Sequence, residues 1–240
     1  MLVLSALFTV TFARHVDIPS VALQNPDLFE GDIIGVEDND VRNAIMKPSR
    51  RWTGGVMPYV IDPELRNIKR YINKAMEHIN QATGGCISFK EREQEKAYVR
   101  FIKGKGCYSH VGRIGREQII SLGNGCGFVG TIVHEIGHAL GFHHEQNRSD
   151  RDDYLIVHWQ NIKKGMEGQF ARLRPDKNVL YVYFDYDSIM IYGNYAFSKD
   201  GKSKTMEAKT GVKLLDPYAK KAPYLAASDV YRIKKLYECA

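Results

Sequence analysis

An eleven-residue run in the middle of the chain constrains the fold more than any other feature. It reads His134-Glu135-Ile136-Gly137-His138-Ala139-Leu140-Gly141-Phe142-His143-His144. Histidines four positions apart lie one turn apart on the same face of a helix, so His134 and His138 can reach a single ion. Gly141 can adopt the left-handed conformation that ends a helix, and the chain can then bring His144 back to the same point. The run predicts a helix at whose side three imidazoles converge.

Three imidazoles indicate a metal site of the catalytic kind. Zn²⁺ held by three neutral histidines keeps a coordination position open, which structural zinc sites do not. Glu135 lies directly beside the first histidine, where its carboxylate can accept a proton from bound water. His143 is one residue out of register and is expected to point away from the ion. The competing interpretation is a chance pattern of ordinary histidines, and each added element of the run makes it less favoured.

Charge is unevenly distributed along the 240 residues, which carry a net charge of +6. Residues 14–42 hold seven acidic and two basic side chains, whereas residues 43–240 hold 21 acidic and 32 basic ones. With 44% hydrophobic and 26% charged residues, the chain is globular and can bury a core. It has no run of eighteen apolar residues, so no membrane span is expected.

The N-terminus has the pattern of a processed extension. Residues 1–13, MLVLSALFTVTFA, are uncharged and largely apolar, like the core of a signal peptide that ends at Ala13. A buried first strand is the alternative. The acidic stretch 14–42 then precedes the basic body 43–240, an arrangement that predicts a propeptide masking its own domain. A secreted, extracellular protein follows from this interpretation.

Periodicity predicts an α+β fold with a regular first half and a less regular second half. Strands are expected at 56–61, 86–90, 97–102 and 118–122, a glycine-rich loop at 104–115, and helices at 63–82, 128–140, 160–172 and 227–238. Ser228 is the expected cap of the last helix. A cleft is expected between the two halves.

Four cysteines, an even number in a secreted chain, indicate disulfides: Cys86, Cys107, Cys126 and Cys239. The absence of a CxxC pair argues against a thiolate zinc site. Composition alone leaves three pairings open.

The histidine run and a second motif resemble the metzincin metalloproteases, whose signature HExxHxxGxxH is followed by a methionine turn. Glu145 directly after the third histidine, the continuation Arg148-Ser149-Asp150-Arg151-Asp152-Asp153-Tyr154 and the later Ser188-Ile189-Met190-Ile191-Tyr192-Gly193 resemble the astacin family specifically. The resemblance implies that Met190 lies beneath the metal. It also implies that Tyr192 is an additional zinc ligand that swings away to stabilise the oxyanion. Ile191 stands where the family usually has histidine, which leaves the zinc ligands intact.

The leader resembles the family as well. Phe29-Glu30-Gly31-Asp32 is similar to the astacin propeptide motif, in which the aspartate binds zinc and displaces the catalytic water. A solvated Asp32 in an acidic loop is the alternative. Cleavage after Arg42 by a trypsin-like protease would expose the ammonium of Asn43, which in the family reaches the residue equivalent to Glu145. The basic stretch 47–51 offers competing cleavage sites.

The resemblance implies a metzincin-type catalytic domain over 43–240. Its N-terminal subdomain, about 43–141, would hold a mixed sheet with two long helices, and the subdomain 142–240 would be less regular. It further implies the disulfides Cys86–Cys239 and Cys107–Cys126, one Zn²⁺ per chain, and protein or peptide substrates. The strand at 118–122 is expected to be the cleft edge to which a substrate adds as a strand.

Two functions are therefore compared. The first is a zinc-dependent endopeptidase made as a latent zymogen. The second is a secreted zinc-containing binding protein that holds anionic matrix or an acidic partner through its basic surface, with little turnover. Glu135 favours the enzyme, because binding alone does not need a general base. Nucleic acid is not an expected partner of a secreted chain, and another metzincin branch is disfavoured by Glu145 and the leader motif.

Overall fold

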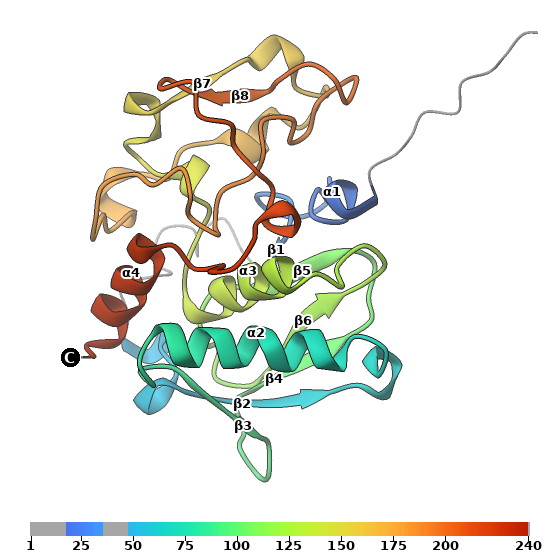
Figure 1. Ribbon diagram of the computed structural model, residues 1–240, viewed down its shortest axis with the longest axis vertical. Helices are drawn as coiled ribbons and strands as arrows, with labels where there is room; N and C mark the ends of the chain where they lie inside the picture. The colour runs from blue at the N-terminus through green and yellow to red at the C-terminus, as the bar shows by residue number, and fades with distance from the viewer. Residues whose placement is uncertain (1–17, 36–47, 240) are drawn as a thin grey trace, which may run out of the picture.

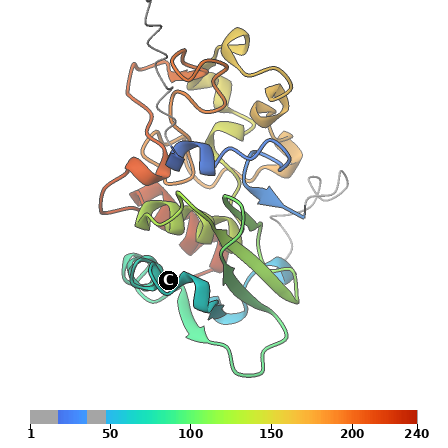
Figure 2. The ribbon, with the colours of Figure 1, turned by 90° about the vertical axis from the view of Figure 1, so that its right-hand side faces the viewer.

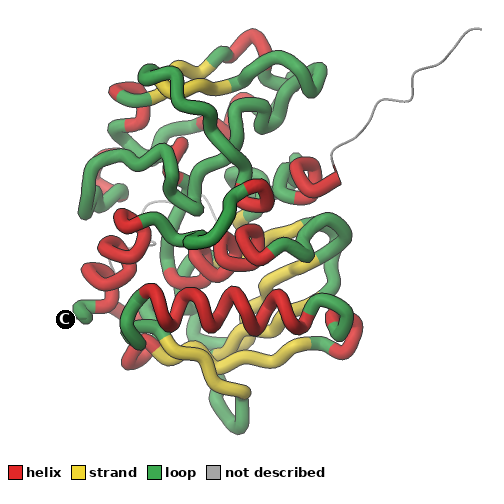
Figure 3. Tube along the Cα trace, in the orientation of Figure 1, coloured by secondary structure: helices red, strands yellow, loops and turns green. Residues whose placement is uncertain are grey.

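The computed structural model describes residues 18–35 and 48–239. They form a half built of sheet and helices and a half built mostly of loops (Figures 1 and 3). The helices are α1 (Ile18–Ala22), α2 (Lys69–Ala82), α3 (Val129–Leu140) and α4 (Ala227–Tyr237). The strands are β1 (Ile33–Ile34), β2 (Val56–Ile61), β3 (Ser88–Glu91), β4 (Tyr98–Ile102), β5 (Cys107–His110), β6 (Glu117–Leu122), β7 (Leu155–Val157) and β8 (Met206–Ala208). Every helix among these residues is too short or too polar to cross a bilayer.

The main sheet is mixed, as expected, and has the strand order β1-β5-β6-β4-β2-β3. Strand β5 runs antiparallel to β6, whereas the other pairs are parallel. The short strand β1 comes from the N-terminal segment and pairs with β5, with Ile33 opposite Ser109. Strand β6 is therefore internal, and the expectation that 118–122 forms the cleft edge is wrong. Without β1, the edge on this side of the sheet is β5.

Two helices form the core with this sheet. Helix α2 buries Ile72, Ala75, Met76 and Ile79, which lie on one face at helical spacing. All twelve residues of α3 are buried, because this helix lies between α2 and the loop-rich half. It ends at Gly141, whose φ of 119° is the left-handed conformation that the sequence predicts.

Several local predictions are wrong. The expected helix 63–82 is a 3₁₀ turn at Pro63–Leu65 followed by α2, and the expected loop 104–115 contains β5. The expected helix 160–172 is two short 3₁₀ turns, Trp159–Asn161 and Glu167–Phe170, separated by Gly165 at a positive φ of 86°. Ser228 does not cap α4. That helix begins after Ala226, whose backbone N–H donates to the side chain of Asp229 at 3.0 Å.

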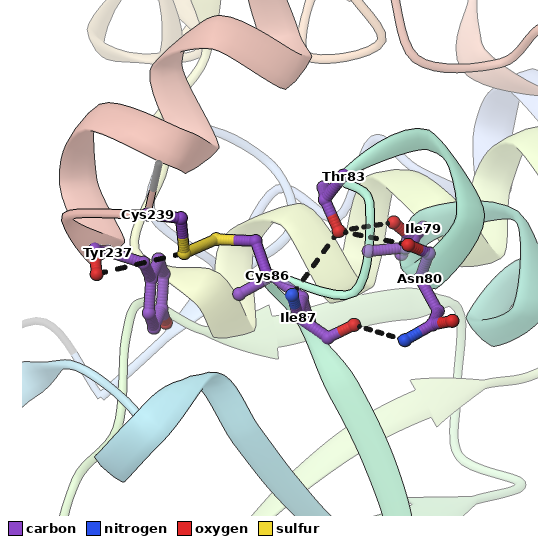
Figure 4. The surroundings of a disulfide bond; sticks show 7 residues. All are labelled: Ile79, Asn80, Thr83, Cys86, Ile87, Tyr237 and Cys239. Carbon is purple, nitrogen blue, oxygen red and sulfur yellow. Dashed lines mark hydrogen bonds between the residues drawn. A yellow bond between two sulfur atoms is a disulfide. The ribbon is translucent and has the colours of Figure 1, made fainter.

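Two disulfides cross-link the fold, with the pairing that the resemblance implies. Cys86–Cys239 spans 153 residues and ties the end of α4 to the turn after α2 (Figure 4). In that turn the Thr83 hydroxyl donates to the carbonyl of Ile79 at 2.8 Å and accepts from the backbone N–H of Ile87 at 3.2 Å. Cys107–Cys126 joins β5 to the loop before α3.

The N-terminal segment 18–35 runs between the two halves (Figure 2). Besides the β1–β5 pairing, its Gln24 accepts a hydrogen bond from the backbone N–H of Phe197 at 2.7 Å. Gln169, from the loop-rich half, donates to the carbonyl of Leu28 at 3.0 Å. The segment therefore contacts both halves at the place where a cleft is expected.

Candidate active site

Three histidine rings meet beside α3. His134 and His138 project from consecutive turns of the helix, and His144 returns from the extended chain beyond Gly141. The Nε2 atom of His134 lies 3.2 Å from Nε2 of His138 and 3.2 Å from Nε2 of His144. All three side chains are buried.

Hydrogen bonds on the far side of the rings fix two tautomers. Nδ1 of His134 donates to the carbonyl oxygen of Ile189 at 2.8 Å, and Nδ1 of His138 donates to that of Phe142 at 2.7 Å. A carbonyl oxygen only accepts, so each Nδ1 carries the hydrogen and each Nε2 carries a lone pair. Two lone pairs at 3.2 Å repel each other unless a cation lies between them.

Asp32, just before β1, completes the group. Its Oδ2 lies 3.0 Å from His134 Nε2 and 3.3 Å from His144 Nε2, and its Oδ1 lies 3.2 Å from His138 Nε2. The carboxylate is fully buried. One ligand atom from each of the four residues lies within 4.8 Å of the others.

This donor set fits zinc. Two ligands at about 2.0–2.1 Å from a tetrahedral ion are about 3.3 Å apart, close to the separations between the Nε2 atoms. Three imidazoles and one carboxylate are also a chemically suitable ligand set for Zn²⁺. The site could therefore hold zinc through His134, His138, His144 and Asp32.

The charges around the site also favour a cation. Burial lowers the pKa of His138 to about 4 despite the opposing effect of Asp32, so this ring stays neutral and keeps a lone pair for a metal ion. Burial also opposes protonation of His144, but Asp32 and Glu30 outweigh it and raise the pKa of this ring to about 9. A field that attracts a proton onto a buried ring also attracts a metal ion.

Glu135 lies beside this cluster without a partner. It is fully buried on α3, and neither carboxylate oxygen has a hydrogen bond within the described part of the chain. Burial and the nearby charge of Asp32 raise the pKa of Glu135 well above its usual value. An unpaired buried carboxyl group with a raised pKa is suited to taking up and releasing a proton.

Tyr192 and Met190 come from the loop-rich half. The Tyr192 ring packs on His144 with ring centroids 4.4 Å apart, and its hydroxyl donates to Asp32 Oδ2 at 2.5 Å. Met190 lies against the helix, where a Cβ built on Gly137 would be 2.6 Å from its Sδ atom. Glycine at 137 therefore permits the close approach of α3 and the Met190 side chain.

Glu145 does not contact the metal cluster. Its Oε1 accepts from Arg148 at 2.8 Å and from the backbone N–H of Asp185 at 3.0 Å, and its Oε2 accepts from Arg232 at 2.5 Å. The side chain is fully buried. Arg42 and Asn43 lie outside the described residues, as do residues 1–17, so the predicted signal peptide and cleavage site are not described.

Sequence reasoning missed the role of Glu30. Its Oε2 lies 2.8 Å from His144 Nδ1, and its Oε1 lies 3.5 Å from Nδ1 of His143. His143 lies outside the four-residue group. The only available signal was the position of Glu30 within the leader motif, two residues before Asp32.

Comparison with known proteins supplies the family. The family model described as "Astacin", a peptidase family, matches residues 44–238. The chain belongs to the astacin family. Its members are zinc endopeptidases, so this astacin is a zinc-dependent metalloendopeptidase acting on peptide or protein substrates.

Relatives of this astacin come from several animal groups. It is 42% identical over 219 residues to astacin-like metalloprotease toxin 1 of Loxosceles intermedia, covering 88% of this chain and 81% of the relative. It is 38% identical over 226 residues to zinc metalloproteinase nas-6 of Caenorhabditis elegans, covering 90% of this chain and 64% of the relative. The solved structure of high choriolytic enzyme 1, a hatching enzyme zinc-protease of Oryzias latipes, has a TM-score of 0.72 at 34% identity and covers 82% of this chain and 100% of that one. These matches support the metzincin-type α+β fold.

Proposed function

We propose that this astacin is a secreted zymogen in which residues 14–42 form a propeptide, residues 43–240 form the catalytic domain, and Asp32 holds the enzyme latent. The observation that carries the proposal is the position of Asp32 among the three Nε2 atoms, at 3.0–3.3 Å from each. A carboxylate at this place takes the coordination position that a catalytic water needs. The pairing of β1 with β5 supports the proposal, because it covers the edge strand of the sheet.

In the active enzyme we assign the chemistry to three histidines, one glutamate and one tyrosine. His134, His138 and His144 hold one Zn²⁺, which when bound polarises the scissile carbonyl and lowers the pKa of water. Glu135 accepts the proton of the attacking water and passes it to the leaving amine. Its buried, unpaired carboxyl group supports this role.

Tyr192 is the proposed oxyanion donor. Its hydroxyl is bound to Asp32 and lies 2.9 Å from the carbonyl oxygen of Leu23, both in the N-terminal segment. Burial and the charge of Asp32 raise the pKa of Tyr192 well above its usual value, so the hydroxyl keeps its proton. Removal of the segment would free this donor for the developing negative charge of the substrate. Met190 supports the site from below.

Activation requires removal of the segment. Cleavage after Arg42 by a trypsin-like protease would release Asp32 and expose an ammonium group at Asn43. Glu145 is the proposed partner of this group. Since it already accepts from Arg148 and Arg232, the ammonium would join an ion cluster rather than neutralise a lone carboxylate.

Secretion is proposed on two grounds: the signal-like residues 1–13 and the two disulfides, which form in oxidising compartments. The basic excess of residues 43–240 is compatible with binding to anionic matrix as a second role.

The experiment uses the full chain from a secretory host, before and after trypsin treatment. We expect about one zinc per chain in both forms, casein cleavage only after treatment, and a new N-terminus at Asn43. Glu135→Gln should keep zinc and lose at least about 100-fold in turnover, because general-base catalysis contributes about 10²–10⁴-fold. Asp32→Asn should raise activity before processing, whereas exposed Asp27→Asn is the matched control and should not. Full activity of the Glu135→Gln protein, or zinc-free preparations that still cleave, would overturn the assignment.

A further inference from the structure

The three histidines differ in what holds their outer ring nitrogen. The first two donate Nδ1–H to backbone carbonyls of residues 189 and 142, which belong to the catalytic domain. For His144, the hydrogen-bond partner of Nδ1 within the described residues is Oε2 of Glu30, at 2.8 Å. Glu30 belongs to the segment that leaves on activation. One of the three candidate histidine ligands therefore takes its outer partner from the proposed propeptide.

The Glu30 carboxylate is held in a built position. It is 1% exposed, and its Oε2 also lies 3.3 Å from the backbone N–H of His144. Its φ of 50° is unusual for a residue other than glycine, and the next residue, Gly31, packs so closely that a Cβ there would be 2.6 Å from Cζ of Phe197. Its other oxygen faces His143 at 3.5 Å. These contacts direct the carboxylate to the third histidine.

We propose that Glu30 is a positioning residue of the latent form, which orients the His144 ring and strengthens its hold on zinc. This rests on the proposed function, because it takes residues 18–35 to be part of the propeptide. A carboxylate on the outer nitrogen of a ligating histidine fixes the ring orientation and raises the basicity of the other nitrogen. Activation would then remove two things together: Asp32 from the open coordination position and the outer partner of His144. Zinc should therefore exchange faster in the processed enzyme than in a protein that has lost only the Asp32 carboxylate.

The test measures zinc release rather than peptide cleavage. The unprocessed full chain is mixed with excess chromophoric chelator, and the rate of zinc transfer is followed by absorbance. Loss of an outer partner lowers metal affinity by about 10–100-fold. We therefore expect Glu30→Ala to release zinc about 10–100-fold faster than the parent. Glu30→Gln keeps the shape and an acceptor oxygen, so its rate should lie between the two.

Asp27→Asn is the matched control, because it removes an acidic charge from the same segment at an exposed position. Its release rate should equal that of the parent. A second measurement does not depend on the folding of a variant. A synthetic peptide of residues 24–35 is added to the processed wild-type enzyme, and the rate of zinc release is measured. The natural peptide should slow zinc release, and the same peptide with the Glu30→Gln change should slow it less.

The outcomes separate the two proposals. Suppose that the chain binds zinc and Asp32→Asn relieves latency, yet both Glu30 variants release zinc at the parent's rate and the two peptides slow release equally. Only the role of Glu30 is then overturned. If the purified chain binds no zinc, or activity is independent of Glu135, the proposed function fails first.

Discussion

The buried ion cluster around Glu145 allows a quantitative prediction for Arg232→Met. Arg232 has a side chain that is 9% exposed and donates to Glu145 at 2.5 Å and to the Ser188 hydroxyl at 2.8 Å. It also forms an ion pair with Asp229. Although burial opposes the charged form, Glu145 and Asp229 raise the pKa of Arg232 above its usual value.

Methionine keeps much of the apolar stem but removes the charge. Breaking a buried pair from one side costs about 3–5 kcal/mol, because the remaining carboxylate stays buried. Glu145 retains Arg148 and the N–H of Asp185, so we expect a loss at the lower end, about 3 kcal/mol. For a domain of this size, a loss of about 1 kcal/mol shifts Tm by about 2–4 °C, which gives a decrease of about 6–12 °C.

The assay is thermal unfolding of the unprocessed chain in a Glu135→Gln background, which prevents self-digestion. Arg51→Met is the control, because its pair with Glu238 is exposed, with 73% of the Glu238 side chain accessible. Such surface pairs contribute about 0.2–1 kcal/mol, so this control should shift Tm by at most about 4 °C. Adding Glu145→Gln to Arg232→Met should recover part of the loss. Equal Tm values for the Arg232→Met and Arg51→Met proteins would refute the reasoning.

Three further predictions follow from close contacts and from the metal. Gly31→Ala should weaken latency, because a left-handed conformation costs alanine about 1–2 kcal/mol and its Cβ would meet Phe197, so activity before processing should rise over that of Asp27→Asn. Gly137→Ala should lower Tm, since its Cβ would be 2.6 Å from the Met190 sulfur, and an unchanged Tm would argue against the helix–turn contact. A chelator should abolish cleavage by the processed enzyme and Zn²⁺ should restore it, and retained activity at zero bound zinc would contradict the metal assignment.

Local patterns in the sequence predicted the helix that carries the site. Positions 134 and 138 are brought together by one helical turn, and the left-handed glycine at 141 is a property of one residue, so both follow from short-range geometry. Asp32 and Tyr192 were predicted only through the family resemblance. They lie 160 residues apart in sequence, and no local pattern relates them.

The errors have two causes, which are long-range pairing that decides local structure and single residues whose own conformation or contacts override the apolar pattern. Strand β5 has no apolar alternation that favours a strand, and its conformation follows from pairing with β6 and from the Cys107–Cys126 link. The supposed helix 160–172 had suitable apolar residues, but the glycine at 165 takes a positive φ that a helix cannot contain. Ser228 does not cap α4 because it lies inside the first turn, after the N-cap residue Ala226, and its hydroxyl donates to Asp185.

The same division into local and long-range contacts explains how the short N-terminal segment 18–35 can hold the site in a latent form, as proposed. Helix α3 alone holds two histidines and Glu135 rigidly, since the partners of the two rings belong to the body. The third histidine and Tyr192 come from irregular chain, and both are bound by the N-terminal segment, through Glu30 and Asp32. In the proposed activation, removing the segment would take Asp32 away from all three histidines. The helix and the backbone partners of His134 and His138 would still hold these two rings, whereas the groups that lack a secondary-structure scaffold would be released. The proposed latency therefore acts in two ways: Asp32 occupies the open coordination position, and the segment holds His144 and Tyr192, which the helix does not fix.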